Sequence, residues 1–177
     1  MTLILISGPP GVGKSTLSKA IAKSLPAMIL DKDCIDDAFF PTDRGAHYTT
    51  EVEPKVLQAV LNLATLNLSV GQNVLLDIPW THIFYQTPIW MERLRSINSQ
   101  IDPLVIELFL EENELKNRMK ERGLSRDDFR LSKEGWTKFL ETDVPHKRNL
   151  FPHFLVDASR KLEEYLPEVL KYLNDQM

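Results

Sequence analysis

The sequence is poor in cysteine and has no long apolar run. Its single cysteine, Cys34, excludes an internal disulfide. No hydrophobic stretch approaches the ~20 residues that a membrane-spanning helix needs, and the short apolar start lacks the positive charge of a signal peptide. These absences predict a soluble protein, and we expect it to be cytoplasmic.

The chain also lacks an excess of positive charge. Its 21 Lys and Arg stand against 25 Asp and Glu, so the net charge is −4 and the overall field repels polyanions. Extended nucleic-acid binding is therefore disfavoured, although a local basic channel is compatible with this composition. His, Cys and acidic residues show no zinc-ligand spacing. From 177 residues of ordinary apolar content we expect one domain over residues 1–177, as a monomer or homodimer.

What the sequence does contain is a phosphate-binding loop. Residues 8–15 follow the pattern G-x-x-x-x-G-K-S/T between the apolar run 3–6 and a helical pattern. Glycines let backbone N–H groups turn inward around a phosphate chain, and the following helix points its positive end at the same anion. We expect Lys14 to reach the outer phosphates and the Ser15 hydroxyl to bind Mg²⁺. The predicted nucleotide contacts here are Gly8, Pro9, Pro10, Gly11, Val12, Gly13, Lys14, Ser15 and Thr16.

Short apolar segments alternate with helical patterns along the chain, which is typical of a parallel α/β sheet. Most of these segments are continuous apolar runs, as expected for strands that are buried on both faces. The predicted strands are residues 3–7, 27–30, 73–76, 104–110 and 154–156.

Local signals also predict helices. Residues 50–53 form a capping-box pattern ahead of a long helix that we expect to stop at Gly71. Residues 87–88, Thr-Pro, are typical of another helix start. The last helical pattern, residues 162–173, contains Pro167, so we expect a kink or a break there.

Two acids follow the second predicted strand. In parallel sheets, ligands lie beyond the carboxyl ends of the strands, so Asp31 and Asp33 should lie beside the phosphate loop. A carboxylate there can take the proton of an acceptor hydroxyl. Asp33 is therefore the candidate general base and Asp31 a candidate acceptor contact. The alternative is that one or both acids cap a helix that begins near Ile35.

The third predicted strand is followed by an acid, Asp77. The run Val-Leu-Leu-Asp at 74–77 resembles a Walker B pattern, in which the acid holds Mg²⁺ directly or through water. Apolar strands that end in Asp are common, but the distance from the phosphate loop favours the functional interpretation.

A basic segment follows the fourth predicted strand. Arg118 and Arg122 share a helix face, and Gly123 lets the chain leave that helix. Cations held over a triphosphate neutralise charge in the transition state and help to exclude water. We expect Arg118, Arg122 and Arg126 to act in this way, against the common alternative of a solvated basic face. Arg130 is expected to be a surface residue.

With its phosphate loop, Asp-x-Asp segment, strand-end acid and Arg-x-x-x-Arg segment in this order, the sequence resembles the small P-loop kinases related to adenylate kinase. It is most similar to the branch that contains polynucleotide 5′-kinases, gluconate kinases, zeta toxins and chloramphenicol phosphotransferases. The resemblance implies a three-layer αβα fold, a five-stranded parallel sheet in the order 2-3-1-4-5, and a short arginine-bearing lid at about residues 118–135. It also implies ATP as donor, Asp33 as base, Arg122 as catalytic lid arginine, Arg118 beside the nucleotide, and adenine near Ala158 and Ser159.

Departures from that group narrow the acceptor. Polynucleotide kinases carry an arginine three residues after the base, where this sequence has Asp36. Arg44 is the only arginine between the second and third predicted strands, which weakens the case for a nucleoside monophosphate kinase. The glycine pair of shikimate kinases and the guanine reader of GTPases are missing, and AAA+ machines need a further helical domain for which there are too few residues.

The sequence thus predicts an ATP-dependent phosphotransferase that acts on a small-molecule hydroxyl. A nucleotide or polynucleotide 5′-end kinase and a non-catalytic ATP-binding regulatory switch are the alternatives. Arg44, Tyr48 and Trp80 are further candidate acceptor contacts, with core packing as the alternative for the aromatics. Glu107 is an unexpected acid inside an apolar strand and a candidate partner of Lys14 or a lid arginine.

Overall fold

A computed structural model describes residues 1–40, 47–78, 102–124, 127–142 and 152–177 of the chain. Its centre is a parallel sheet in the order β2-β3-β1-β4-β5, as predicted. Each predicted strand agrees with the structure to within one residue at its end, because buried parallel strands are continuous apolar runs. The strands are β1 Leu3–Ser7, β2 Ala27–Asp31, β3 Asn73–Asp77, β4 Leu104–Phe109 and β5 Phe154–Asp157.

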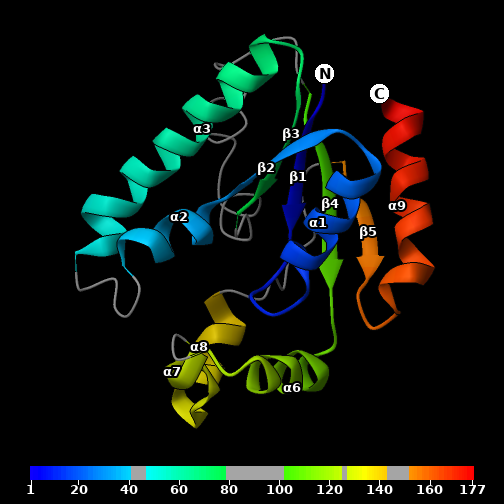
Figure 1. The fold of residues 1–177 in the computed structure, drawn as a ribbon. Helices are drawn as coiled ribbons and strands as arrows, with labels where there is room; N and C mark the ends of the chain where they lie inside the picture. The colour runs from blue at the N-terminus through cyan, green and yellow to red at the C-terminus, as the bar shows by residue number, and fades with distance from the viewer. Residues whose placement is uncertain (41–46, 79–101, 125–126, 143–151) are drawn as a thin grey trace.

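Helices cover both faces of the sheet and its carboxyl edge (Figure 1). One face carries α3, the other α1 and α9, and α6, α7 and α8 gather at the end to which the strands point. We call these last three helices the lid; they include most of the predicted lid segment. The helices are α1 Lys14–Ser24, α2 Lys32–Phe39, the π-helical turn η1 Tyr48–Val52, α3 Glu53–Ser69, α6 Glu112–Arg122, α7 Asp128–Leu131, α8 Lys133–Thr142 and α9 Leu162–Gln176.

The core has two layers, one on each face of the sheet. Along β1, Ile4 and Ile6 belong to the cluster with α1 and α9, while Leu3 and Leu5 belong to the cluster with α3. This alternation follows from the two-residue period of a strand. Side chains of α6 and α8 join the first cluster, so the lid packs on the body of the protein through a continuous core.

Two helix starts differ from the sequence-based expectation. α2 begins at Lys32 instead of near Ile35, because Asp31 caps it directly from the end of β2. α3 begins at Glu53 after η1, and the Thr50 hydroxyl donates to the carbonyl oxygen of His47 instead of capping α3.

The end of α3 and the course of α9 can also be compared with the sequence-based expectations. The chain leaves α3 at Gly71, as predicted, with φ +84° and its N–H donating to the carbonyl oxygen of Leu68. α9 is not broken at Pro167, since buried side chains on both sides of the proline anchor it to the core: Tyr165, Val169 and Leu173. The predicted helix start at 87–88 lies outside the described residues. Among the described residues, no helix combines the length and apolar character that crossing a lipid bilayer requires.

Candidate active site

The phosphate-binding loop joins β1 to α1 at the carboxyl edge of the sheet. Gly8 and Gly11 have φ values of +137° and +89°, which side-chain-bearing residues rarely adopt. A Cβ at Gly8 would lie 2.6 Å from the carbonyl oxygen of Leu108, and one at Gly11 would lie 2.7 Å from Cγ of Met119. The glycines therefore let the loop run close to β4 and to the lid helix α6.

The N-terminus of α1 is available to an anion. Gly13 occupies the N-cap position with no side-chain cap, and the first turn contains no acid. Ser15 and Thr16 in this turn are exposed. Uncapped backbone N–H groups and the positive end of the helix dipole suit the phosphates of a nucleotide, so these residues fit the predicted ligand.

Lys14 is the electrostatic centre of the site. Its ammonium donates to the carbonyl oxygens of Gly8 at 2.9 Å and Pro9 at 3.1 Å. Burial lowers the pKa of Lys14 to about 8, although neighbouring carboxylates oppose that change. The charged side chains close enough to act on it are, in order of influence, Asp77, Asp33, Arg122 and Asp31. Loop lysine, strand-end acids and lid arginine thus converge as predicted.

Two strand-end acids lie side by side. Asp31 and Asp77 are partners in the register of β2 and β3, and Asp77 is buried and accepts a 3.2 Å hydrogen bond from the Ser18 hydroxyl. Burial, and next the charge of Asp77, raise the pKa of Asp31, against the lowering effect of backbone N–H donors. Negative charge concentrated at this point favours a bound cation.

A metal would need ligands beyond the protein here. Among the described residues, no three His, Cys, Asp or Glu side chains form a metal-binding group. Ser15 and Asp77 would therefore hold Mg²⁺ together with phosphate oxygens and water, which is the usual arrangement for this ion. The residues fit that role, and the metal assignment stays a prediction.

Asp31 and Asp33 take different positions in the structure, which bears on the two roles that the sequence left open for them: helix cap and general base. Oδ1 of Asp31 accepts hydrogen bonds from the N–H groups of Asp33 at 2.9 Å and Cys34 at 3.2 Å, so Asp31 is the N-cap of α2. Asp33 lies half-buried in the first turn of α2 and acts on the charge of Lys14. This leaves Asp33 as the better-placed candidate for a base.

The lid contacts the turn after β5. The Arg118 guanidinium donates to the carbonyl oxygen of Ala158 and to Glu114, both at 2.8 Å, while the N–H of Ser159 donates to the Asp157 carboxylate at 2.9 Å. The structure therefore brings together the two segments between which adenine is predicted to lie.

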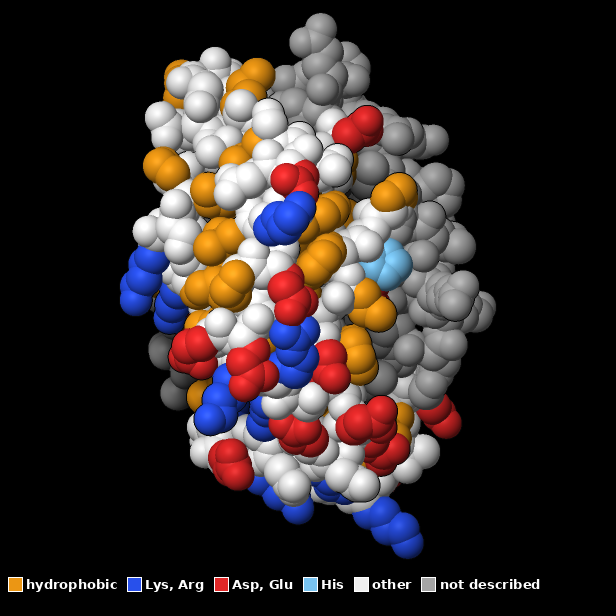
Figure 2. Space-filling view, turned by 90° about the vertical axis from the view of Figure 1, so that its right-hand side faces the viewer, with side chains coloured by type: hydrophobic (Ala, Val, Ile, Leu, Met, Phe, Trp, Pro, Cys, Tyr) orange, Lys and Arg blue, Asp and Glu red, His pale blue; other side chains and the backbone are white. Residues whose placement is uncertain are grey.

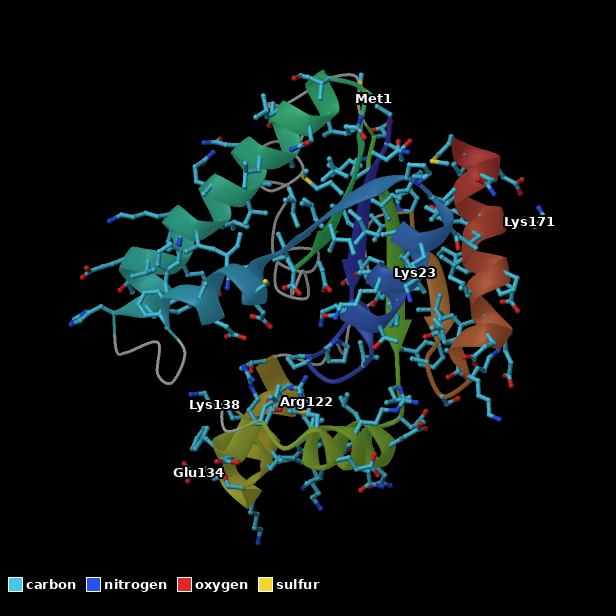
Figure 3. All side chains as sticks on the ribbon, in the orientation of Figure 1. Met1, Lys23, Arg122, Glu134, Lys138 and Lys171 are labelled. Carbon is cyan, nitrogen blue, oxygen red and sulfur yellow. The ribbon has the colours of Figure 1, made fainter. Side chains whose placement is uncertain are left out.

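Arg122 lies where the lid faces the sheet (Figure 3). Its Nε donates to Oδ2 of Asp127 at 2.6 Å, and Nη1 of Arg130 donates to Oδ1 of the same carboxylate at 3.3 Å. Asp127 is completely buried. Arg130 is thus more than the surface residue expected from the sequence, and Asp127, which the sequence analysis missed, is the centre of an arginine pair.

A second buried polar cluster was also missed. Nζ of Lys32 contacts Oδ2 of Asp36 at 2.8 Å, the Tyr48 hydroxyl at 2.9 Å and Oε1 of Glu53 at 2.9 Å, and Tyr48 also donates to Asp36. These partners outweigh the effect of burial and raise the pKa of Lys32, while burial is the main cause that raises the pKa of Tyr48 to about 12. Tyr48 lies in this cluster, and its contact with an acceptor stays a prediction.

Glu107 is buried, and its carboxylate lies 3.6 Å from Nε2 of His153; the ammonium of Lys14, one of its expected partners, donates to loop carbonyls instead. Arg44, Trp80 and Arg126 lie outside the described residues.

Known proteins share this fold. A family model described as AAA domain (AAA_33) matches residues 3–144. The match covers a single domain. It therefore does not bear on whether the chain is an AAA+ machine, which would need a second, helical domain. No curated protein sequence matches the chain significantly.

Three solved structures cover nearly the whole chain. A provisionally named kinase from Chloroflexus aurantiacus j-10-fl is 21% identical over 99% of this chain and 97% of its own, with a TM-score of 0.75. A sugar kinase from Janibacter sp. HTCC2649 is 16% identical (98% and 95% covered, TM-score 0.68), and a gluconokinase from Sinorhizobium meliloti 1021 is 18% identical (99% and 97% covered, TM-score 0.61). The resemblance to small P-loop kinases is confirmed at the level of the fold.

Proposed function

The chain belongs to this AAA domain family, and from that premise we propose that it is an ATP-dependent phosphotransferase. It transfers the γ-phosphate of Mg-ATP to a hydroxyl group of a small molecule. The observation that carries this proposal is the convergence of Asp77, Asp33 and Arg122 on Lys14. Phosphoryl transfer depends mainly on positioning and on neutralising charge, which is what such a set of groups supplies.

Each converging group has a separate task in this proposal. The loop N–H groups and Lys14 bind the phosphates, and Ser15 and Asp77 hold the metal. Arg122 neutralises the charge that develops on the transferred group, and Arg118 orients the nucleotide from its position on the Ala158 carbonyl.

Asp33 is the proposed general base. The Asp31 cap fixes the backbone of Asp33 through a 2.9 Å hydrogen bond, so the Asp33 side chain starts from a set point in the first turn of α2. A carboxylate beside the phosphate loop can hold an acceptor hydroxyl in line and take its proton.

The proposed acceptor class, a small molecule with a free hydroxyl, is supported by the Asp36 position. The buried Asp36 pairs with Lys32 inside the protein, so an anionic side chain stands where the resembling polynucleotide kinases use an arginine. A nucleotide or polynucleotide end is therefore the weaker choice. On the described part of the face that carries α9, acidic and basic side chains are interspersed (Figure 2), so this face offers a polyanion no continuous basic surface.

The test is an ATP-consumption assay across classes of acceptor: sugars and sugar acids, polyols, nucleosides, nucleotides, amino alcohols, and short oligonucleotides with a 5′-hydroxyl. Wild type is compared with Asp33→Asn, and Asp175→Asn serves as a matched control because Asp175 is an exposed carboxylate near the end of α9. Product analysis by mass spectrometry identifies the phosphorylated compound.

Acceptor-stimulated turnover that falls at least ~100-fold in Asp33→Asn, while ATP binding is kept, is the expected result. ATP binding with no stimulation by any class would instead support the regulatory switch. Full turnover in Asp33→Asn would remove Asp33 from the mechanism and leave the phosphotransferase proposal standing.

A further inference from the structure

Asp127 holds two arginines from two lid helices with one carboxylate. Oδ2 accepts from Nε of Arg122, the last residue of α6, and Oδ1 accepts from Nη1 of Arg130 in α7. We propose that Asp127 is a positioning residue that aims Arg122 at the phosphates before any ligand binds. This inference rests on the proposed function, since it concerns the lid of the same site.

The geometry leaves the far side of the guanidinium for a ligand. Asp127 engages Arg122 at Nε, and among the described residues the two terminal amino groups of Arg122 have no hydrogen-bond partner. Arg122 is 29% exposed while Asp127 is not exposed at all. Asp127 therefore holds the guanidinium at Nε, while the two terminal amino groups can bind phosphate oxygens in parallel.

Electrostatic repulsion explains why Arg122 needs a carboxylate partner. Arg122 lies close enough to Lys14 to lower the pKa of that lysine, so the two cations repel each other when no nucleotide is bound. A buried carboxylate behind Arg122 offsets this repulsion and keeps the arginine in place. Arg130 on the second oxygen compensates the charge of Asp127, so the cluster keeps a net positive charge toward the phosphates.

Hydrogen bonds within the lid support Asp127. The Asp127 N–H donates to the carbonyl oxygen of Leu124 at 2.8 Å. Nε1 of Trp136 in α8 donates to Glu112 in α6 at 2.8 Å, which ties together the helices on either side of Asp127. A short polar side chain on a fixed backbone is an effective support for a catalytic group.

A double-mutant cycle separates positioning from plain structural support. Asp127→Asn keeps the size of the side chain and removes its charge, and we expect it to lower kcat at least ~10-fold with little change in the KM for the acceptor. In an Arg122→Gln background the same change should alter kcat less than ~2-fold, because the group that Asp127 positions is already gone. Asp128→Asn, an exposed neighbour in α7, is the control and should match wild type.

Equal losses of kcat from Asp127→Asn in both backgrounds would overturn the proposal, since a merely structural residue acts independently of Arg122. If Asp127→Asn unfolds, the cycle is repeated with Arg130→Gln added to remove the uncompensated charge. The loss of kcat should again be larger with Arg122 present than in the Arg122→Gln background.

A second readout does not depend on catalysis. In ligand-free wild type, the ¹H–¹⁵N signal of Arg122 Nε should be shifted by its carboxylate partner and slow to exchange with water, and both features should vanish in Asp127→Asn. A fast-exchanging Arg122 signal in wild type would contradict the positioning role. A protected signal in a protein that phosphorylates no acceptor would leave the lid inference intact and reject the proposed function alone.

Discussion

Arg118 and Ala158 are joined by a 2.8 Å hydrogen bond although 40 positions separate them in the sequence. The bond connects the lid helix α6 to the turn that follows the edge strand β5. It gives the lid a fixed distance from the side of the site where the nucleobase is expected.

We therefore expect Arg118→Met to weaken the use of ATP and to leave the chemical step nearly intact. Loss of a charge-assisted hydrogen bond costs about 1.5–3 kcal/mol, so the KM for ATP should rise at least ~10-fold while kcat changes little. Steady-state kinetics with ATP as the varied substrate provide the measurement. Arg160→Met is the control, because Arg160 pairs with Glu168 on the exposed surface of α9; an equal KM effect there would remove the special role of Arg118.

Lys14 makes nucleotide affinity dependent on pH. Its pKa in the free protein is about 8, and bound phosphates favour the charged form and raise it. Binding then weakens as pH rises through 8, because the free protein must take up a proton: between pH 7 and pH 9 the affinity for ATP should fall roughly tenfold.

Isothermal titration calorimetry at pH 7, 8 and 9 measures this dependence. Lys14→Met should bind weakly and with a flat pH profile, whereas Lys19→Met, an exposed lysine of α1, should retain the wild-type profile. A flat profile in wild type would show that Lys14 does not titrate in this range.

Lys32 stabilises the fold through its buried partners. Lys32→Met removes the Lys32 ammonium from Asp36 and Glu53, and removing one member of a buried ion pair costs about 3–5 kcal/mol. The free energy of unfolding from urea denaturation should fall by that amount. Lys55→Met, an exposed lysine in α3, should change it by less than about 0.5 kcal/mol.

The same cluster predicts the direction of the alkaline response. The pKa values of Lys32 and Tyr48 are raised above their ordinary values of 10.5 and 10.0, so the folded state holds protons that the unfolded state releases. Stability from these groups is therefore full below about pH 10 and falls as pH rises further. The difference in unfolding free energy between wild type and the double variant Lys32→Met/Tyr48→Phe should shrink above pH 10.

Gly135 is a helix position at which alanine should destabilise the protein. Alanine normally favours a helix over glycine by about 1 kcal/mol, yet a Cβ at Gly135 would lie 1.8 Å from the carbonyl oxygen of Phe129. Overpacking against backbone costs about 1–3 kcal/mol, so Gly135→Ala should lower the free energy of unfolding. Thr137→Ala, at an exposed site of the same helix, should be neutral or slightly stabilising. An unchanged free energy of unfolding in Gly135→Ala would mean that α7 and α8 separate easily.

The fold was predictable because its signals are local. Each strand is a short apolar run, and Gly8 and Gly11 are needed where the loop approaches β4 and α6 this closely. The convergence of Lys14, Asp33 and Asp77 followed from one rule, that parallel strands bring their carboxyl ends to one edge.

The buried charges were not predictable in the same way. No sequence signal indicates that Lys32, Asp36 and Asp127 are buried, since isolated charges are rarely buried. Their burial depends on partners from other helices, such as Glu53 for Lys32, and on a turn that folds Asp127 under Arg122. Sequence spacing shows the pair at Lys32 and Asp36 but not whether it faces solvent or the interior.

Asp31 is both the last residue of β2 and the N-cap of α2. No residue separates sheet from helix, so this junction has no linker in which insertions and deletions could accumulate. The start of α2 is therefore set by the strand register. For protein engineering, this means that an insertion between β2 and α2 should displace the proposed catalytic carboxylate of Asp33 from the phosphate loop.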